Sequence, residues 1–365
     1  MSETRGGGLA YSTQELMQQA MMLKASDIHL SPGRPPLVRV NGELAPLDGI
    51  DPLTPDDTMT LAKKSLSEEH WKQFLETREL DLSVSEPGVG RFRINLHWQR
   101  GSVAIALRSI AHNIPGFEEL GLPRVVQDIA KREHGLFIVS GPTGSGKTTT
   151  LASILDYINT HRSSHIVTIE DPIEYLHRHK RSLVTQREIH SDTLSFGEAL
   201  RHVLRQDPDV ILIGEIRDLD TMQIALTAAE TGHLVFATLH TQDCPQSIDR
   251  IIDVFPPHQQ EQIRVQIGAT LEGVVAQQLL PKVGSKGRVA ACEVLMPTPA
   301  VRNLIREGKT HQLYTVMQTG SQQGMQTMNA SLAEHIKAGR ISKDNALRRT
   351  GDPEELERLL MSGVG

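Results

Sequence analysis

The chain has 365 residues, and 38 Lys and Arg against 44 Asp and Glu give it a formal net charge of −6. This length fits two or three domains, and the acidic balance argues against a protein whose main task is to coat nucleic acid or an anionic membrane. With 38% hydrophobic and 22% charged residues, the composition is that of a folded globular protein.

The cysteines and the apolar segments exclude further classes. Cys244 and Cys292 cannot supply a four-thiolate zinc site, so we expect no zinc and two reduced thiols. The amino-terminal residues form no apolar signal segment, and apolar runs such as 136–139 are far shorter than the ~18 residues that suggest a membrane span. We therefore expect a cytoplasmic protein that reaches a membrane only by recruitment.

The first predicted elements are a helix and a hairpin. Ser12 and Glu15 form a capping box, and apolar residues recur at helical spacing after it. Strands are expected at 27–30 and 37–40, and the second runs into Asn41-Gly42, a strong signal for a type I′ turn.

Two alternating runs follow a helical stretch that is expected at 54–76. The second run, at 103–107, repeats the pattern of the first after a turn. In the first run an apolar face alternates with a polar one: Phe92, Ile94, Leu96 and Trp98 against Arg91, Arg93, Asn95 and His97. These elements predict a small α+β domain over residues 1–112 with an antiparallel sheet.

The pattern changes in the rest of the chain. A stretch rich in proline and glycine at 113–123 predicts a linker. We assign 124–297 to a core domain and 298–365 to a more polar, helical subdomain. In the core, short apolar segments alternate with helical ones, which indicates an α/β fold with a buried parallel sheet: 135–140, 165–169, 210–213 and 233–239.

A glycine-rich loop lies between the first of these strands and a predicted helix, and it fits the pattern G-x-x-x-x-G-K-[ST]. Its backbone N–H groups would surround phosphates, aided by the helix N-terminus. Lys147 would reach the β- and γ-phosphates, and the Thr148 hydroxyl would ligate Mg²⁺. The predicted nucleotide-binding residues are Gly141, Pro142, Thr143, Gly144, Ser145, Gly146, Lys147, Thr148 and Thr149.

A second segment, 207–215, is an apolar strand that ends in an acid, which is the Walker B layout. Gly214 stands where an Asp usually holds the magnesium ion, and the carboxylate is that of Glu215. Thr148 is then the direct protein ligand, and Glu215 would act on the metal through water or orient the attacking water.

Two further segments carry polar groups next to buried strands. Residues 169–175 contain three carboxylates, including Glu174, a cluster that suits magnesium coordination and activation of water beside a triphosphate. His233 and His240 bracket another strand and are candidate sensors of the γ-phosphate, although a lone histidine is more often structural.

Together these segments resemble the type II/type IV secretion ATPases. Residues 204–218 resemble the family signature over their whole length, 169–175 resemble its Asp box and 233–241 its His box. The similarity to the type IV pilus retraction ATPases of twitching motility covers nearly the full chain. Outside the motifs it rests on residues 25–30, 91–93, 118–122, 186–188 and 300–305.

The resemblance implies a homo-hexameric ring of two-domain subunits, each with a PAS-like N-terminal domain and a RecA-like P-loop core. Such a motor would bind ATP and Mg²⁺ between its two domains and hydrolyse ATP to power pilus retraction. Its implied partners are the inner-membrane pilus platform protein, on whose cytoplasmic face the ring docks, and a paralogous retraction ATPase.

The resemblance also implies roles for single residues. Glu174 is the catalytic base and Glu215 the Walker B acid, while Lys147 and Thr148 hold phosphate and Mg²⁺. His233 and His240 follow the γ-phosphate. Positive charge would reach the nucleotide from three arginines of the N-terminal domain: Arg91, Arg93 and Arg108.

A last segment is linked in the retraction family to pulling the pilus rather than to splitting ATP. It comprises Ala300, Val301, Arg302, Asn303, Leu304 and Ile305, and the family usually has Ile where Val301 stands. Val301, Leu304 and Ile305 form an apolar stripe on a helix, and we expect Arg302 and Asn303 to be exposed.

Three alternatives stay open on the residues alone. An extension or secretion ATPase of the same superfamily carries a tetracysteine zinc insertion, for which two cysteines do not suffice. A nucleic-acid motor needs a basic channel and stacking aromatics, whereas this chain is acidic with 4% aromatic residues, so we expect no nucleic-acid partner. A paralogue that only binds ATP would regulate another motor, and the intact Lys147, Glu174 and Glu215 argue against this.

Overall fold

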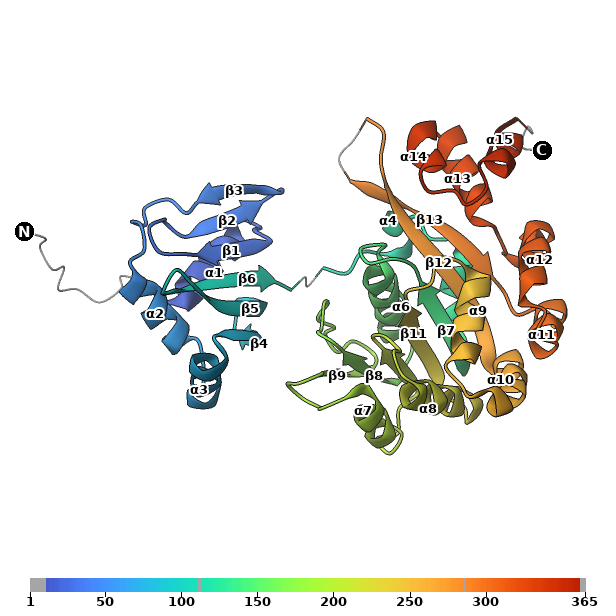
Figure 1. Cartoon of the computed structure of the whole chain (residues 1–365), viewed down its shortest axis with the longest axis horizontal. Helices are drawn as coiled ribbons and strands as arrows, with labels where there is room; N and C mark the ends of the chain where they lie inside the picture. Colours follow the sequence, from blue (N-terminus) through green and yellow to red (C-terminus); the bar gives the residue numbers. More distant parts are fainter. Residues whose placement is uncertain (1–10, 111–112, 285–286, 362–365) are drawn as a thin grey trace, which may run out of the picture. The chain divides into compact units, whose positions relative to one another are not determined.

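The computed structural model describes residues 11–110, 113–284 and 287–361 (Figure 1). The chain divides into two compact units, and the boundary lies between His112 and Asn113. Each unit is described by itself.

The first unit is a six-stranded antiparallel sheet in the order β3-β2-β1-β6-β5-β4. Its strands are β1 (Asp27–Leu30), β2 (Leu37–Val40), β3 (Glu43–Pro46), β4 (Glu79–Glu86), β5 (Gly90–Gln99) and β6 (Ser102–Ser109). The helices α1 (Thr13–Met22), α2 (Pro55–Lys64) and α3 (Glu68–Thr77) pack against β1, β6 and β4. The apolar side chains of β5, namely Phe92, Ile94 and Leu96, are buried in the core that results.

Local signals predicted much of this unit. The capping box of α1 is present, with both hydrogen bonds between Ser12 and Glu15. Asn41 and Gly42 join β2 to β3 with φ values of 52° and 91°, which are the positive angles that a type I′ turn requires. The single helical stretch expected at 54–76 is wrong in one respect, because Ser67 caps a new helix by accepting a hydrogen bond from His70 N.

The second unit is built on a seven-stranded sheet in the order β13-β12-β7-β11-β10-β8-β9. All neighbouring pairs are parallel except β12 and β13, so the expected parallel sheet is confirmed and extended by strands at both sides. The strands are β7 (Gly135–Ser140), β8 (His165–Glu170), β9 (Leu183–Glu188), β10 (Val210–Ile213), β11 (Leu234–Leu239), β12 (Leu271–Pro281) and β13 (Arg288–Leu295).

Helices cover this sheet. The helix α6 follows β7, and α8 packs against both α7 and α10. Within 113–123, Phe117 and Leu122 pack on the core, and the Phe117 ring lies edge-on to Tyr157 with 5.5 Å between centroids. The helices are α4 (Phe117–Leu120), α5 (Arg124–Ile129), α6 (Lys147–His161), α7 (Phe196–Val203), α8 (Leu219–Glu230), α9 (Cys244–Asp253) and α10 (Pro257–Thr270).

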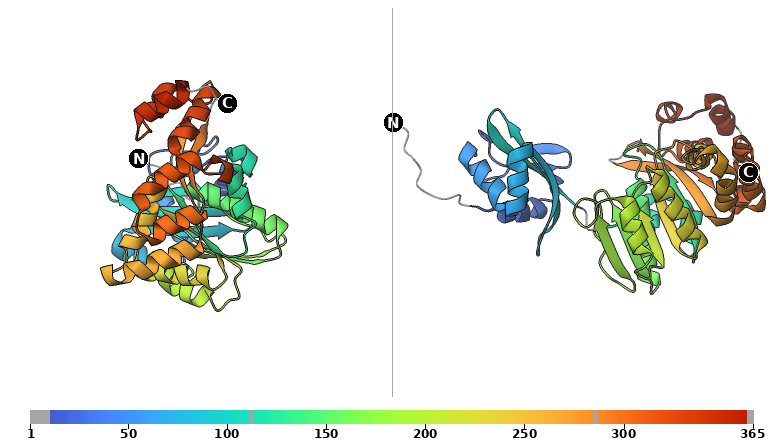
Figure 2. Two further views of the ribbon diagram at one scale, coloured as in Figure 1. Left: turned by 90° about the vertical axis from the view of Figure 1, so that its right-hand side faces the viewer. Right: turned by 60° about the horizontal axis from the view of Figure 1, so that its bottom comes forward.

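The carboxy-terminal helices pack in two places. The helices α11 (Pro299–Arg306) and α12 (Leu313–Thr319) contribute to the main core of the unit. A separate small core joins the far ends of β12 and β13 to the last three helices (Figures 1 and 2). These are α13 (Met328–Lys337), α14 (Lys343–Leu347) and α15 (Pro353–Met361). Within the described ranges no helix is both long and apolar enough to cross a membrane.

Candidate active site

The carboxyl ends of four neighbouring parallel strands meet at one edge of the second sheet. The strands β7, β11, β10 and β8 lie side by side, and each leads into a segment singled out from the sequence. In open α/β sheets this edge is where ligands bind. The topology therefore gathers the glycine-rich loop, His240, Glu215 and the loop that carries Glu174.

The glycine-rich loop needs its glycines for space as well as for backbone angles. Gly141 has a φ of 140°, and a Cβ atom there would lie 2.3 Å from the carbonyl oxygen of Gln277. Gly146 has a φ of 91°, and its Cβ would lie 2.8 Å from the Gln277 side chain. Gln277, on the neighbouring strand β12, also accepts a hydrogen bond from Thr150 Oγ1 at 2.8 Å. It therefore packs closely against the loop and is hydrogen-bonded to the start of α6.

Lys147 is buried at the centre of this loop. Its Nζ atom donates hydrogen bonds to the carbonyl oxygens of Gly141 at 2.7 Å and of Pro142 at 3.1 Å. Burial lowers the pKa of Lys147, and the carboxylates of Glu215 and Glu174 act in the opposite direction. The lysine thus faces both acids that the sequence analysis singled out.

The loop has the features of a phosphate cradle. Gly141, Gly144 and Gly146 all have positive φ, which curls the backbone. Among the described residues the Ser145 hydroxyl is buried without a hydrogen-bond partner, so a polar atom inside the loop is left for a ligand. The donor set therefore fits a phosphate group. Within the described chain no three His, Cys, Asp or Glu side chains come together as a metal site.

Glu215 lies directly after β10 and is held from two sides. Its carboxylate forms an ion pair with Arg217, and the other oxygen lies 3.4 Å from His240 Nε2. Although Glu215 itself is only 13% exposed, Arg217 is 70% exposed and reaches the acid from solvent. Arg217 lies within residues 204–218, the segment that resembles the family signature, but no sequence pattern indicated this ion pair.

Gly214, which precedes this acid, lies close to the backbone of the neighbouring strand β8. A Cβ atom at residue 214 would lie 3.2 Å from the carbonyl oxygen of Ile169 and 3.3 Å from the Cα atom of Glu170. The Gly214 N–H donates to that same Ile169 carbonyl at 2.8 Å. A side chain at this position would require the backbone of β8 to give way by a few tenths of an ångström.

The two histidines do not share a location. His240 follows the carboxyl end of β11 and contacts Glu215. His233 precedes the amino end of the same strand, where its Nδ1 atom lies 3.0 Å from the Ala228 carbonyl oxygen. A six-residue strand separates them by roughly 20 Å. His233 therefore lies at the opposite end of β11 from Glu215 and the glycine-rich loop, and the proposed sensing of the γ-phosphate by both histidines stays a prediction.

A fully buried acid lies beneath the loop that carries Glu174. Glu170, the last residue of β8, accepts hydrogen bonds from Thr168 Oγ1 at 2.7 Å and from Gln186 Nε2 at 3.2 Å. Burial raises the pKa of Glu170 to about 7. Glu174 itself is exposed, so the two acids occupy opposite environments four residues apart.

The same loop also contacts the helix of the glycine-rich loop. The hydroxyl groups of Tyr175 and Thr149 lie 3.0 Å apart. Thr149 was predicted as a nucleotide-binding residue, and in this structure it joins α6 to the loop of Glu174. The side chains of Gln186 and Gln277, which no sequence motif indicated as site residues, hold these segments from the neighbouring strands β9 and β12.

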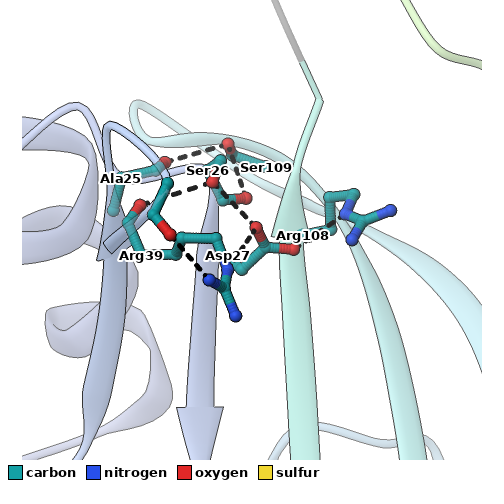
Figure 3. Close-up of polar contacts among 7 residues, drawn as sticks. Ala25, Ser26, Asp27, Arg39, Arg108 and Ser109 are labelled. Carbon is teal, nitrogen blue, oxygen red and sulfur yellow. Dashed lines mark hydrogen bonds and ion pairs between the residues drawn. The ribbon is translucent and has the colours of Figure 1, made fainter. Parts of the chain in front are cut away.

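The three arginines of the first unit lie on its polar sheet face. Arg93 and Arg108 are paired directly across β5 and β6, and Arg108 is paired across β1 with Asp27. Arg108 Nε donates to Asp27 at 2.8 Å, while Arg39 approaches the same acid from β2 at 3.9 Å (Figure 3). Burial raises the pKa of Asp27, but hydrogen bonds from Arg108 and Ser26 outweigh it and hold this pKa below the usual range.

The segment at 300–305 forms most of α11, and its apolar stripe packs into the core of its own subunit. Val301 and Ile305 are fully buried and Leu304 packs against the same core.

Asn303 is exposed as expected, but the expected exposure of Arg302 is wrong. Arg302 donates to the carbonyl oxygens of Gly268 at 2.7 Å, Ala269 at 2.9 Å and Pro297 at 3.0 Å, and it pairs with Glu272. The Gly268 and Ala269 carbonyls lie in the last turn of α10, so Arg302 caps that helix from α11.

We predict that Arg302→Ala lowers the free energy of unfolding by about 2 kcal/mol, because carbonyls of a helix end lose a charged donor. Asn303→Ala, at an exposed site on the same helix, is the matched control and should change it by less than about 0.5 kcal/mol. Urea unfolding of both variants measures this. Equal stability of the two would contradict the capping role.

The buried Glu170 predicts a pH-dependent stability. A carboxyl whose pKa rises from 4.5 to about 7 on folding loses its contribution to stability as pH rises through this window. Glu170→Gln removes that loss. Its unfolding free energy relative to the parent should therefore increase by up to about 3 kcal/mol between pH 4.5 and pH 8. Unfolding at several pH values tests this, and a pH-independent difference would refute it.

Comparison with known proteins agrees with this geometry. Residues 104–348 match the family model described as "Type II/IV secretion system protein". In Pseudomonas aeruginosa, the type IV pilus retraction ATPase PilT is 46% identical over 93% of this chain and 98% of its own length. The type IV pilus ATPase PilU of the same organism is 40% identical over 96% and 91%.

A solved structure of the pilus retraction motor PilT with bound ADP superposes with a TM-score of 0.89. It is 51% identical and covers 95% of this chain and 99% of that one. The chain therefore belongs to the family of type II/IV secretion ATPases, with the P-loop core that defines these enzymes.

Proposed function

We propose that this chain is a hexameric motor that hydrolyses ATP to power the retraction of type IV pili, and with it twitching motility. The observation that carries the proposal is the buried Lys147, set in a phosphate-binding loop and facing Glu174 and Glu215. This site lies in a chain that aligns over nearly its full length with a named pilus retraction ATPase.

In this proposal the residues of the loop bind and orient ATP. The amides of the loop and Lys147 hold the phosphates, and the Thr148 hydroxyl ligates Mg²⁺. When bound, the metal neutralises charge that develops on the phosphates. Glu174 takes a proton from the water that attacks the γ-phosphorus, so that ADP leaves as the new P–O bond forms. Glu215 orients this water or acts on the metal through water, and His240 senses the γ-phosphate.

The domain roles belong to the same proposal. Residues 1–112 form a PAS-like domain, 113–123 a linker, 124–297 the RecA-like core and 298–365 a helical subdomain. Arg91, Arg93 and Arg108 bring positive charge to the phosphates, with Arg108 held by Asp27.

Arg93→Ala in the full chain should lower kcat for ATP hydrolysis by ~10-fold or more, since an arginine supplied to the transition state is worth ~10³–10⁵ in other P-loop enzymes. Arg100→Ala, at an exposed turn of the same unit, is the matched control. Steady-state hydrolysis by both variants decides the point. An unchanged kcat in Arg93→Ala would remove this residue from the proposal.

The partners and the location are proposed on the resemblance. The ring docks at the cytoplasmic face of the inner membrane on the pilus platform protein. A paralogous retraction ATPase is a further partner, and the presence of PilT and PilU in one organism supports this. No nucleic acid takes part.

One experiment tests the function as a whole. A strain that lacks the gene is complemented with the parent chain, Lys147→Ala, Glu174→Gln or Glu133→Gln, and pilus retraction is scored beside ATP hydrolysis. Loss of the general base should lower hydrolysis by about 10²–10⁴ while nucleotide binding stays intact. Glu133 is the control, because it is an exposed acid before the amino end of β7, away from the carboxyl ends of the strands where the site lies.

Retraction is expected only with the parent chain and with Glu133→Gln. Normal retraction with Lys147→Ala would overturn the proposed function. Normal hydrolysis by Glu174→Gln would instead overturn the assignment of the base.

A further inference from the structure

The loop that carries Glu174 is fastened on both sides of this residue by one edge strand. The sheet ends at β9, whose only partner strand is β8 in the described sheet. Gln186 and Glu188 lie two residues apart on β9, so their side chains leave the same face of the strand. Both side chains bind the main chain of the loop.

Glu188 makes the contact that precedes Glu174. Its Oε2 atom accepts a hydrogen bond from the Ile173 N–H at 3.1 Å. Glu188 is buried, with 4% of its surface exposed. Ile173 is buried as well and anchors the loop through its side chain. The residue directly before Glu174 is therefore fixed by both its backbone and its side chain.

Gln186 makes the contacts that follow Glu174. Its Nε2 atom donates to the Tyr175 carbonyl oxygen at 2.9 Å and to Glu170 Oε1 at 3.2 Å. Its Oε1 atom accepts from the His177 N–H at 2.8 Å. One carboxamide thus uses both donors and its acceptor on the loop and on the acid beneath it. Only a side chain with two donors and an acceptor at this length can make all three contacts.

These contacts hold the backbone on both sides of Glu174 and so affect where its carboxylate lies. The Glu174 residue is exposed, whereas its backbone N–H donates to the Glu170 carboxyl and the residues on either side of it are held from β9. The position of the Glu174 carboxylate depends on the position of the backbone that carries it. A displacement of a catalytic group by ~1 Å can lower the rate by ~10²-fold. The contacts of Gln186 do not include any atom of residues 141–148, where the phosphates are proposed to bind.

We propose that Gln186 is a positioning residue for hydrolysis, which holds the loop of Glu174 in the place from which this carboxylate reaches the attacking water. The inference rests on the proposed function, since it takes Glu174 as the base. It separates binding from turnover: Gln186 makes no hydrogen bond to the phosphate loop and is linked to Thr149 only through Tyr175, whereas it holds the loop of the base directly. Glu188 acts with Gln186 from the same strand.

The test uses Gln186→Met in the full chain, because Met keeps the length and packing of Gln and removes all three hydrogen bonds. We expect kcat for ATP hydrolysis to fall by ~10–100-fold, while KM and the Kd for ADP stay within about twofold. Amide hydrogen exchange at His177 should accelerate, since this N–H loses its acceptor. Thr185→Val on the same strand is the matched control, because Thr185 contacts His165 and not the loop.

Gln186→Asn is a second variant for the case in which Met destabilises the fold, as judged by thermal unfolding. It keeps the amide but shortens its reach by one methylene, and the same fall in kcat is expected. An unchanged kcat together with faster exchange at His177 would overturn the proposal. A parallel loss of ADP affinity in both variants would also overturn it, because Gln186 would then support the fold of the site in general.

Glu174→Gln separates this inference from the proposed function. If Glu174→Gln is inactive and Gln186→Met is fully active, the positioning role alone fails. If Glu174→Gln hydrolyses ATP like the parent chain, the assignment of the base fails, and the role of Gln186 fails with it.

Discussion

A buried ammonium group is the constraint on which the catalytic end of this protein depends. Lys147 is removed from water, and the charged form of a lysine is costly in such a place unless polar groups replace the solvent. The carbonyl oxygens of Gly141 and Pro142 meet this need directly, and the carboxylates of Glu174 and Glu215 meet it at longer range. The backbone can turn its carbonyls toward the lysine only because glycines permit the curl of the loop.

The segments around the lysine come from different strands, and polar side chains join them. Gln277 joins β12 to the start of α6, Tyr175 joins the loop of Glu174 to the same helix, and Gln186 joins that loop to β9. Such side chains succeed where apolar packing cannot, because each loop exposes N–H and C=O groups that need partners. The sheet provides a rigid frame, and these few amide and hydroxyl groups transfer its rigidity to the loops.

How far the sequence predicted this arrangement depends on how local each signal is. The capping box at Ser12, the Asn41-Gly42 turn and the glycine-rich loop before α6 each rest on residues a few positions apart, and each is present in the structure. The contacts of Arg302 and Gln186 could not be predicted, because their partners lie elsewhere along the chain. Arg302 donates to Gly268, and Gln186 donates to Glu170. His233 and His240 belong to the same sequence motif. Because one precedes and the other follows the strand β11, they lie at opposite ends of that strand.

The close approach of two backbones at Gly214 limits which residues can replace this glycine. A side chain at this position would push the end of β8 and with it the loop beyond, because its close contacts are with backbone atoms. The acid is displaced to Glu215, past the end of β10, where Arg217 and His240 can reach it. An aspartate placed at residue 214 would therefore also need the end of β8 to shift. The close spacing of β8 and β10 at this point therefore disfavours a carboxylate at residue 214 and leaves the negative charge to Glu215.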